Sequence, residues 1–251
     1  MQTYSIHAVW FGERPALSRQ MFYGDPHDAP VTVAYYVWVV TDGQRTLVVD
    51  LGFTPEVAQK RGRQIARPVG DGLRAIGVDP AAVTDAVITH FHYDHVGNYR
   101  LFPNAVFHVQ DDEMRLFTGR YLRFRPYRDL DICNFVRLNY DGRLRFVDGD
   151  KQLLPGVTLH RVGGDSAALQ AVRVATRRGY AVVASDAAHF YRNMEEHAPF
   201  PLYLTHSLPQ VHEAFDRIQE LADGPDLIFP GHDPAVLERF EPAGERIVVL
   251  R

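Results

Sequence analysis

The feature that most constrains this chain is a group of three histidines and one aspartate that directly follows an apolar segment. That segment, Val83–Thr89, is predicted to be a buried strand, and His90, His92, Asp94 and His95 come immediately after it. Because alternate residues of extended backbone point to the same side, the first two histidines can bind one metal ion, and Asp94 and His95 can turn toward a neighbouring ion. Without a metal, these polar groups at a buried strand end would carry a desolvation cost. We therefore expect a site of imidazole and carboxylate ligands, which suit zinc, iron or manganese.

Strand-like and helix-like segments alternate along the chain without a low-complexity linker or an internal repeat. Their order predicts an α/β (α+β layered) fold in which two sheets pack face to face with helices outside, an αββα sandwich forming one domain over residues 1–251. Turns at Asp42-Gly43 and Thr176–Gly179 predict two hairpins. The other predicted strands are Val31–Val40, Thr46–Val49, Ala105–Val109, Leu144–Val147, Thr158–Val162, Ala171–Ala175, Tyr180–Ala184 and Leu227–Phe229. The predicted helices are Glu56–Ile65 (opened by Pro55), Asp71–Ile76, Asp111–Phe117 and Val211–Leu221.

The segment Gly119–Tyr140 differs from the rest because it is dense in arginine and aromatic residues and has no clean period. Such a composition fits a loop or helical lid that covers a pocket, and it fits a plain surface insertion equally well. We therefore expect 119–140 to be an insertion that is a candidate lid over the active site.

The composition excludes several classes of protein. The 251 residues carry a net charge of -4, which argues against a nucleic-acid binder. The single cysteine, Cys133, excludes an intramolecular disulfide and a multi-cysteine zinc site. The most apolar stretch, Val31–Val40, is about half as long as a membrane span, and the segment Met1–Glu13 does not read as a secretory signal. We expect a cytoplasmic protein that binds neither nucleic acid nor membrane.

The histidine-rich loop THFHYDHVGN resembles the H-x-H-x-D-H hallmark of the metallo-β-lactamase superfamily. Three further positions carry the resemblance: Asp50 in an Asp-x-Gly at a strand end, Asp186 in Ala184-Ser185-Asp186, and His232 in Pro-Gly-His. Within the superfamily, the chain is most similar to the N-acyl homoserine lactonase family. The stretches that match this family are Gly24–Asp28, His90–Asn98, Ser185–Tyr191, Asn193–Glu196 and Pro230–Pro234.

The resemblance implies a centre of two divalent metal ions. The first would be held by His90 and His92. The second would be held by Asp94, His95 and His232, with the Asp186 carboxylate bridging the two ions. Asp50 would support the ligands from outside the centre. Zn²⁺ is the first expectation for both ions, and Mn²⁺ or Fe²⁺ is the alternative.

One position departs from the family pattern. The family has a third histidine ligand of the first metal in a Gly-His-Ser/Thr context, and Asp165 stands at that place, within Gly163–Gln170. His160 is a weaker substitute because it is predicted to lie on the preceding strand. The aspartate removes one unit of positive charge from the site, which should weaken Lewis acidity and favour hard, oxygen-preferring ions beside zinc. A ligand role for Asp165, a mononuclear site and an impaired site remain the alternatives.

The activity that the resemblance implies is hydrolysis of a lactone ring by a hydroxide that bridges the two metals. Asp94 would accept the proton of the nucleophile and deliver it to the leaving group. Three residues after the bridging aspartate, where well-known lactonases have a substrate-contacting tyrosine, this chain has His189, which we predict to donate a hydrogen bond or proton to the substrate. Phe22 is a candidate for the pocket entrance, and Tyr191 is a weaker candidate that more simply reads as a packing residue.

Other functions stay open at this point. A thioester or ester hydrolase resembling the glyoxalase II branch would use the basic segment Arg120–Arg128 for an anionic substrate. A metal-binding homologue without catalysis is suggested by Asp165, and a redox diiron protein fits less well because of His92. A homodimer is a further expectation, since an aromatic N-terminal segment would form an interface or line the pocket entrance. That segment contains Trp10, Phe11, Met21, Phe22 and Tyr23.

Overall fold

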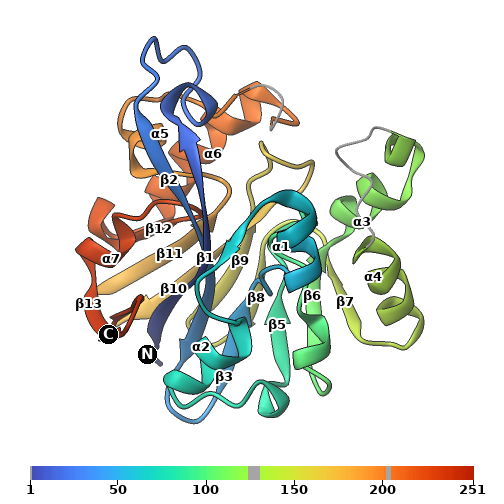
Figure 1. Ribbon diagram of the computed structural model, residues 1–251. Coiled ribbons are helices and arrows are strands. Elements are labelled where there is room, and N and C mark those ends of the chain that lie inside the picture. The colour runs from blue at the N-terminus through green and yellow to red at the C-terminus, as the bar shows by residue number, and fades with distance from the viewer. Residues whose placement is uncertain (1, 124–130, 202–204) are drawn as a thin grey trace.

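The computed structural model describes residues 2–123, 131–201 and 205–251. Two β-sheets pack face to face, and helices cover the outer face of each, so the predicted αββα sandwich in a single domain is confirmed (Figure 1). The larger sheet has the order β13-β14-β1-β2-β3-β5-β6-β7, with β4 paired to β1, and the smaller has the order β12-β11-β10-β9-β8. The strands of the larger sheet are β1 (Ser5–Leu17), β2 (Pro30–Thr41), β3 (Thr46–Val49), β4 (Gln64–Ile65), β5 (Asp85–Val87), β6 (Val106–Gln110), β7 (Leu144–Val147), β13 (Glu241–Gly244) and β14 (Ile247–Leu250). Those of the smaller sheet are β8 (Lys151–Leu154), β9 (Val157–Arg161), β10 (Gln170–Thr176), β11 (Gly179–Ser185) and β12 (Ile228–Pro230).

The helices divide between the two outer faces. Those that come early in the chain pack on the larger sheet, and those after β11 pack mainly on the smaller one, although the last of them also contacts β13 and β14 at the edge of the larger sheet. The first group is α1 (Pro55–Arg61), α2 (Val69–Ala75), α3 (Asp111–Thr118) and α4 (Asp131–Tyr140). The second group is α5 (Tyr191–Glu195), α6 (Leu208–Leu221) and α7 (Val236–Arg239). The longest of them, α6, has 14 residues, and within the described ranges no helix has the length and apolar character needed to cross a bilayer.

Strand β2 explains why the run Val33–Val40 has an aliphatic or aromatic residue at every position. Its even-numbered residues from Ala34 to Val40 pack into the core between the two sheets, and its odd-numbered residues from Val33 to Val39 pack under helices α1 to α4. Because successive side chains of a strand point to opposite faces, a strand covered on both sides needs apolar residues throughout.

Most of the predicted elements are present with small shifts of their ends, including both hairpins. One prediction was wrong: the helix expected over Glu56–Ile65 ends at Arg61. Gly62 takes a left-handed conformation at its C-terminus, with φ of 62°, and Gln64–Ile65 then pairs with β1 as a short strand. Strand pairing outweighed the helical pattern of those last residues.

The structure also contains strands that the sequence pattern did not indicate. The longest is β1, whose 13 residues pair with β2 on one side and with β14 on the other. Its sequence mixes charged and apolar residues because it is buried unevenly and carries a bulge between Trp10 and Gly12. The pairing of β1 with β14 also brings the two chain ends close together (Figure 1).

The candidate lid 119–140 is partly outside the described residues, because 124–130 are not placed. Its second half forms α4, which buries Ile132, Phe135 and Leu138 against the core under the larger sheet. This part is therefore a packed helix, not a solvated loop.

The strand order places the chemically interesting residues at one end of the sandwich. β3 and β5 run parallel to each other, as do β11 and β12, so the carboxyl ends of each pair meet at one edge. A candidate ligand or supporting residue follows each of these strands, and another lies between β9 and β10. In chain order these residues are Asp50, His90, Asp165, Asp186 and His232.

Gly97 is fixed by the close approach of two loops near this end. Its N–H donates to the carbonyl of Gly52 at 2.7 Å, and a Cβ at Gly97 would lie 2.7 Å from the Cα of Phe53. We expect Gly97→Ala to lower the free energy of unfolding by about 1–3 kcal/mol, because backbone must move to admit the methyl group. Thermal or urea unfolding measures this effect. Gly224→Ala is the control, since a Cβ there meets open space; equal stability of the two variants would contradict the argument.

Candidate metal centre

Two groups of side chains at the carboxyl ends of the strands, all buried except the partly exposed His92, have the composition of metal sites. The first consists of His90, His92, Asp165 and Asp186, and the second of Asp94, His95, Asp186 and His232. Within each group, the nitrogen or oxygen atoms that would bind a metal all lie within 4.8 Å of one another. Asp186 belongs to both groups, so the arrangement can hold two ions joined by one carboxylate.

The first group is compact. His90 Nε2 lies 2.9 Å from His92 Nδ1, and Asp165 Oδ2 lies 2.8 Å from His92 Nδ1 and 3.2 Å from His90 Nε2. Two ligands bonded to one zinc ion at 2.0–2.2 Å in tetrahedral geometry are about 3.3 Å apart. The three atoms are therefore spaced as ligands of a common ion would be, and Asp165 lies where a third ligand of such an ion would be needed.

The second group is built around Asp186, the carboxylate that the two groups share. His232 Nε2 lies 3.0 Å from Asp186 Oδ2, and His95 Nε2 lies 3.4 Å from Asp186 Oδ1. Asp94 places one oxygen 3.7 Å from His95 Nε2 and the other 3.7 Å from His232 Nε2. These separations again match those of ligands around one ion.

Unsatisfied polar atoms show that the residues fit metal ions. Both carboxylate oxygens of Asp165, Oδ1 of Asp186 and Nε2 of His95 are buried and have no hydrogen-bond partner among the described residues. Burying such atoms without a partner costs free energy, and charged groups cost most. His92 Nδ1 approaches Asp165 Oδ2 to 2.8 Å without hydrogen-bond geometry, which is the relation expected of two ligands of one metal.

Asp50 links the end of β5 and the loop after it to the end of β11. Its Oδ2 lies 2.7 Å from Nδ1 of His95, and its Oδ1 accepts a hydrogen bond from the backbone N–H of Thr89. The Thr89 and Ser185 hydroxyls also donate to it. Asp50 and Ser185 have positive φ angles of 62° and 48°, so local backbone strain is maintained at the ends of β3 and β11, at Asp50 itself and next to Asp186.

Asp50→Asn should lower metal affinity about 10–100-fold, the usual cost of losing a residue that orients a ligand. Asparagine tolerates the left-handed backbone, so the change removes the negative charge beside His95 and one acceptor oxygen with little added strain. Competition with a chromophoric chelator measures the affinity. Asp79→Asn, at an exposed helix end, is the control; an unchanged affinity in Asp50→Asn would remove Asp50 from the supporting role.

Glu113 is a functional candidate that the sequence analysis missed. It lies in the first turn of α3 and is 1% exposed. Its Oε1 accepts from the N–H of Phe91, and its Oε2 accepts from the Ser166 hydroxyl and the N–H of Ala168. Glu113 therefore joins the loop of His90 and His92 to the loop of Asp165. The sequence contains one signal that could have identified Glu113. It lies three and four residues before the buried Leu116 and Phe117, so the predicted helix carries a carboxylate on its buried face.

The electrostatics keep the two carboxylates of the first group ionised. Burial alone would raise the pKa of Asp165, but the charge of His92 holds it well below its usual range. The pKa of Asp186 is also well below its usual range, since the charges of His232 and His95 outweigh burial. Burial opposes charge on His92, yet the Asp165 carboxylate raises the His92 pKa to about 8.

The remaining predicted residues lie at different places. His189 is beside the centre, with Nε2 3.4 Å from Asp186 Oδ2. Tyr191 is turned into the core, where its hydroxyl donates to the carbonyl of Ile228, so it reads as a packing residue. Phe22 is buried against Phe190, with ring centroids 5.3 Å apart. His160 lies on β9, as expected, and bonds to Asp150 away from the centre.

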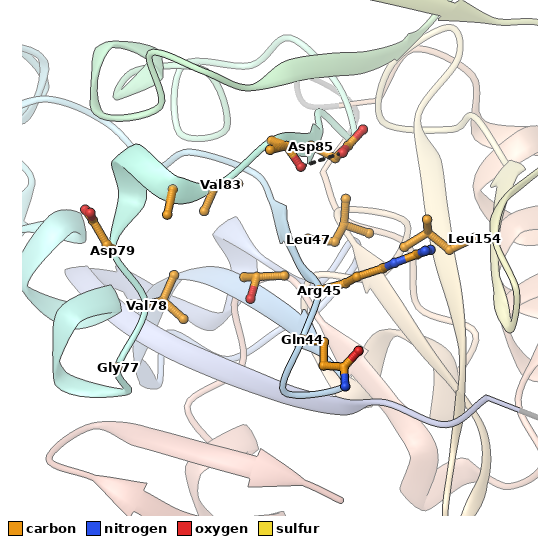
Figure 2. Close-up of a pocket in the computed structure, with 12 residues that line it drawn as sticks. Gln44, Arg45, Leu47, Gly77, Val78, Asp79, Val83, Asp85 and Leu154 are labelled. Carbon is orange, nitrogen blue, oxygen red and sulfur yellow. Dashed lines mark hydrogen bonds between the residues drawn. The ribbon is translucent and has the colours of Figure 1, made fainter.

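A separate pocket of about 490 Å³ lies away from the centre (Figure 2). Its wall includes Thr46 and Leu47 at the start of β3 and Asp85 at the start of β5. The candidate ligands follow the opposite ends of these strands. The pocket therefore contributes nothing to the metal centre.

The fold and the paired ligand groups define a class of protein, and the comparison of sequences identifies it. The family model of the Metallo-beta-lactamase superfamily matches residues 31–232, so this chain belongs to that superfamily.

Named relatives are lactonases. The chain is 29% identical over 256 residues to the N-acyl homoserine lactonase AttM of Rhizobium johnstonii, covering 90% of this chain and 91% of that protein. It is 26% identical to an N-acyl homoserine lactonase of Bacillus thuringiensis over 64% of this chain, and it spans only 60% of that relative's length. A solved N-acyl homoserine lactone hydrolase with N-hexanoyl-L-homoserine at its catalytic metal centre superposes with a TM-score of 0.79 at 18% identity, covering 96% of this chain and 98% of that one. The last similarity concerns the fold alone.

Proposed function

We propose that this protein is a metal-dependent hydrolase that opens the lactone ring of an N-acyl homoserine lactone. The observation that carries the proposal is the pair of ligand groups that share Asp186, with buried ligand atoms left without hydrogen bonds. The names of the relatives supply the substrate class, because an N-acyl homoserine lactonase from Rhizobium matches along 90% of this chain.

Seven residues would hold two divalent ions. The first ion would take His90, His92 and Asp165, the second would take Asp94, His95 and His232, and Asp186 would bind both. The mixture of imidazole and carboxylate favours zinc, with Mn²⁺ or Fe²⁺ as alternatives because Asp165 adds a hard oxygen ligand. When bound, two such ions polarise a carbonyl group and lower the pKa of water, which is the chemistry that hydrolysis of a lactone requires.

Asp94 is the carboxylate best placed to move a proton. It is 7% exposed, whereas Asp165 and Asp186 are 2% and 4% exposed. A group that takes a proton from the nucleophile and returns it to the leaving alcohol needs access to both, so the more open carboxylate suits the task. Asp165 and Asp186, deeper in the protein, would act as ligands only.

The segment before β2 would form one wall of the substrate site. Phe22 packs on Phe190, the residue after His189, and Arg192 lies over the Phe22 ring while pairing with Asp25 at 2.6 Å. The Asn193 amide also donates to the carbonyl of Met21. The rings of Phe22 and Phe190, the second adjacent in sequence to His189, would offer an apolar surface to the acyl chain of the substrate.

The test is metal analysis of the purified protein together with turnover of an acyl homoserine lactone, an acyl thioester and a phosphoester. Two metals per chain with lactone turnover that is lost on chelation and restored by Zn²⁺, Mn²⁺ or Fe²⁺ would support the proposal. Preference for the thioester would favour the glyoxalase II-like alternative, and metal without any turnover would favour a non-catalytic homologue.

A substitution at position 165 tests whether Asp165 is a metal ligand. Asp165→His restores the unit of positive charge and the ligand type that the family pattern has at this place. It should change the number of bound metals or the rate of lactone hydrolysis. A variant unchanged in both would contradict the assignment of Asp165 as a ligand.

A further inference from the structure

His189 is a buried imidazole without a hydrogen-bonding explanation. The residue is 2% exposed, and neither ring nitrogen has a hydrogen-bond partner among the described residues. Its Nε2 lies 3.4 Å from Asp186 Oδ2 and 3.7 Å from Asp165 Oδ1, yet neither contact has hydrogen-bond geometry. A polar ring that is buried in this way indicates a missing partner at the point where it meets the two carboxylates.

The two distances are those of metal ligands in the same centre. In the second group, His95 Nε2 lies 3.4 Å from Asp186 Oδ1, and His232 Nε2 lies 3.7 Å from Asp94 Oδ2. The distances from His189 Nε2 to the Asp186 and Asp165 oxygens are thus the same as those between candidate ligands of the second group. His189 lies outside both ligand groups as they were drawn above, but of its two carboxylate neighbours Asp186 is shared and Asp165 belongs to the first group only. The ion that it would approach is therefore the first one.

The surroundings hold the ring in this position. It stacks on Phe200, with centroids 4.2 Å apart and planes 18° from parallel. Its carbonyl accepts from the N–H of His232 at 2.9 Å, so its backbone is tied to another ligand. A buried ring that is stacked on one face and carried by a hydrogen-bonded backbone is preorganised to bind, since little side-chain entropy is left to lose.

We propose that His189 binds the first metal ion through Nε2 and compensates for the aspartate at position 165. A carboxylate is shorter than an imidazole, and a neutral imidazole adds a donor without removing more positive charge. This role differs from the hydrogen bond to the substrate that the sequence suggested, because a substrate donor needs an accessible nitrogen and both nitrogens here are buried. The inference depends on the metal centre of the proposed function.

The experiment compares cobalt binding by the wild-type protein and by His189→Phe, which keeps an aromatic ring against Phe200 and removes both nitrogens. Metal-free protein is titrated with Co²⁺, and both the affinity of each site and the visible ligand-field spectrum are recorded. We expect two Co²⁺ per chain in the wild type. In the variant, we expect the affinity of one site to fall at least tenfold and its ligand-field bands to change. His108→Gln is the matched control, because His108 is also buried but bonds to Asp85 away from the centre.

A second measurement needs no variant. Histidines bound to Co²⁺ give paramagnetically shifted proton signals, so the loaded wild-type protein should show signals from five ligating imidazoles; four would contradict the inference. Wild-type affinity and spectrum in His189→Phe would also overturn it, even if turnover falls. A wild-type protein that binds no cobalt would instead overturn the metal centre of the proposed function.

Discussion

Asp186→Asn should leave the protein folded and lower both metal binding and hydrolysis by more than about 100-fold. Residues that merely orient a ligand cost 10–100-fold when lost, and Asp186 is shared by both ligand groups. The amide keeps the size of the side chain but has only one oxygen and no charge, so it can bind at most one of the two ions, and only as a weaker, neutral ligand. Metal content after dialysis at a defined free zinc concentration, measured together with initial rates on the lactone, gives the result.

The control is Asp226→Asn, since Asp226 is exposed and lies in the short helix before β12. It should keep wild-type metal content and rate. If Asp186→Asn still bound two ions with wild-type affinity, the bridging arrangement would be wrong. The two groups would then have to be separate sites or a polar network without metal.

Glu113→Gln should cost about 3 kcal/mol of stability and weaken the first metal site selectively. One end of the carboxylate faces the Phe91 N–H and the other faces donors from Ser166 and Ala168, so an amide must turn its NH₂ group toward a donor. Leaving a buried donor unpaired costs about 1–3 kcal/mol, and hydrogen bonds to charged groups are at the strong end of their range. For a chain of this length, the melting temperature should fall by about 6–12 °C.

Cobalt titration separates positioning from general destabilisation. The first site should lose about 10–100-fold in affinity, while the second, whose ligands do not contact Glu113, should be unchanged. Glu220→Gln on the exposed face of α6 is the control. Equal loss at both sites, or none at either, would mean that Glu113 only stabilises the fold.

The sequence predicted the layered fold and the composition of the centre because both depend on local patterns. Continuous apolar strands such as Val31–Val40 indicate burial on both faces, and the close spacing of His90, His92, Asp94 and His95 indicates a shared site. Both signals lie within about ten residues of chain. The structure places these four residues together with Asp186 and His232.

What the sequence could not predict depends on contacts between distant segments. β1 is a strand because β2 and β14 lie on either side of it, and its own residues carry little periodicity. Glu113 matters because two loops that are more than 50 residues apart meet at α3. The same limit applies to His189, whose relation to Asp165 appears only when β9, β10 and β11 have been assembled.

The ligands come from both sheets, since His90, His92, Asp94 and His95 follow a strand of the larger one and Asp165, Asp186 and His232 follow strands of the smaller one. Metal ions bound there would act as cross-links between the two halves of the sandwich. Folding and metal uptake would then be thermodynamically linked, and free metal at a thousand times the dissociation constant would add about 4 kcal/mol to the stability of the native state. The resistance of this protein to heat and proteolysis would accordingly follow the supply of metal in its surroundings.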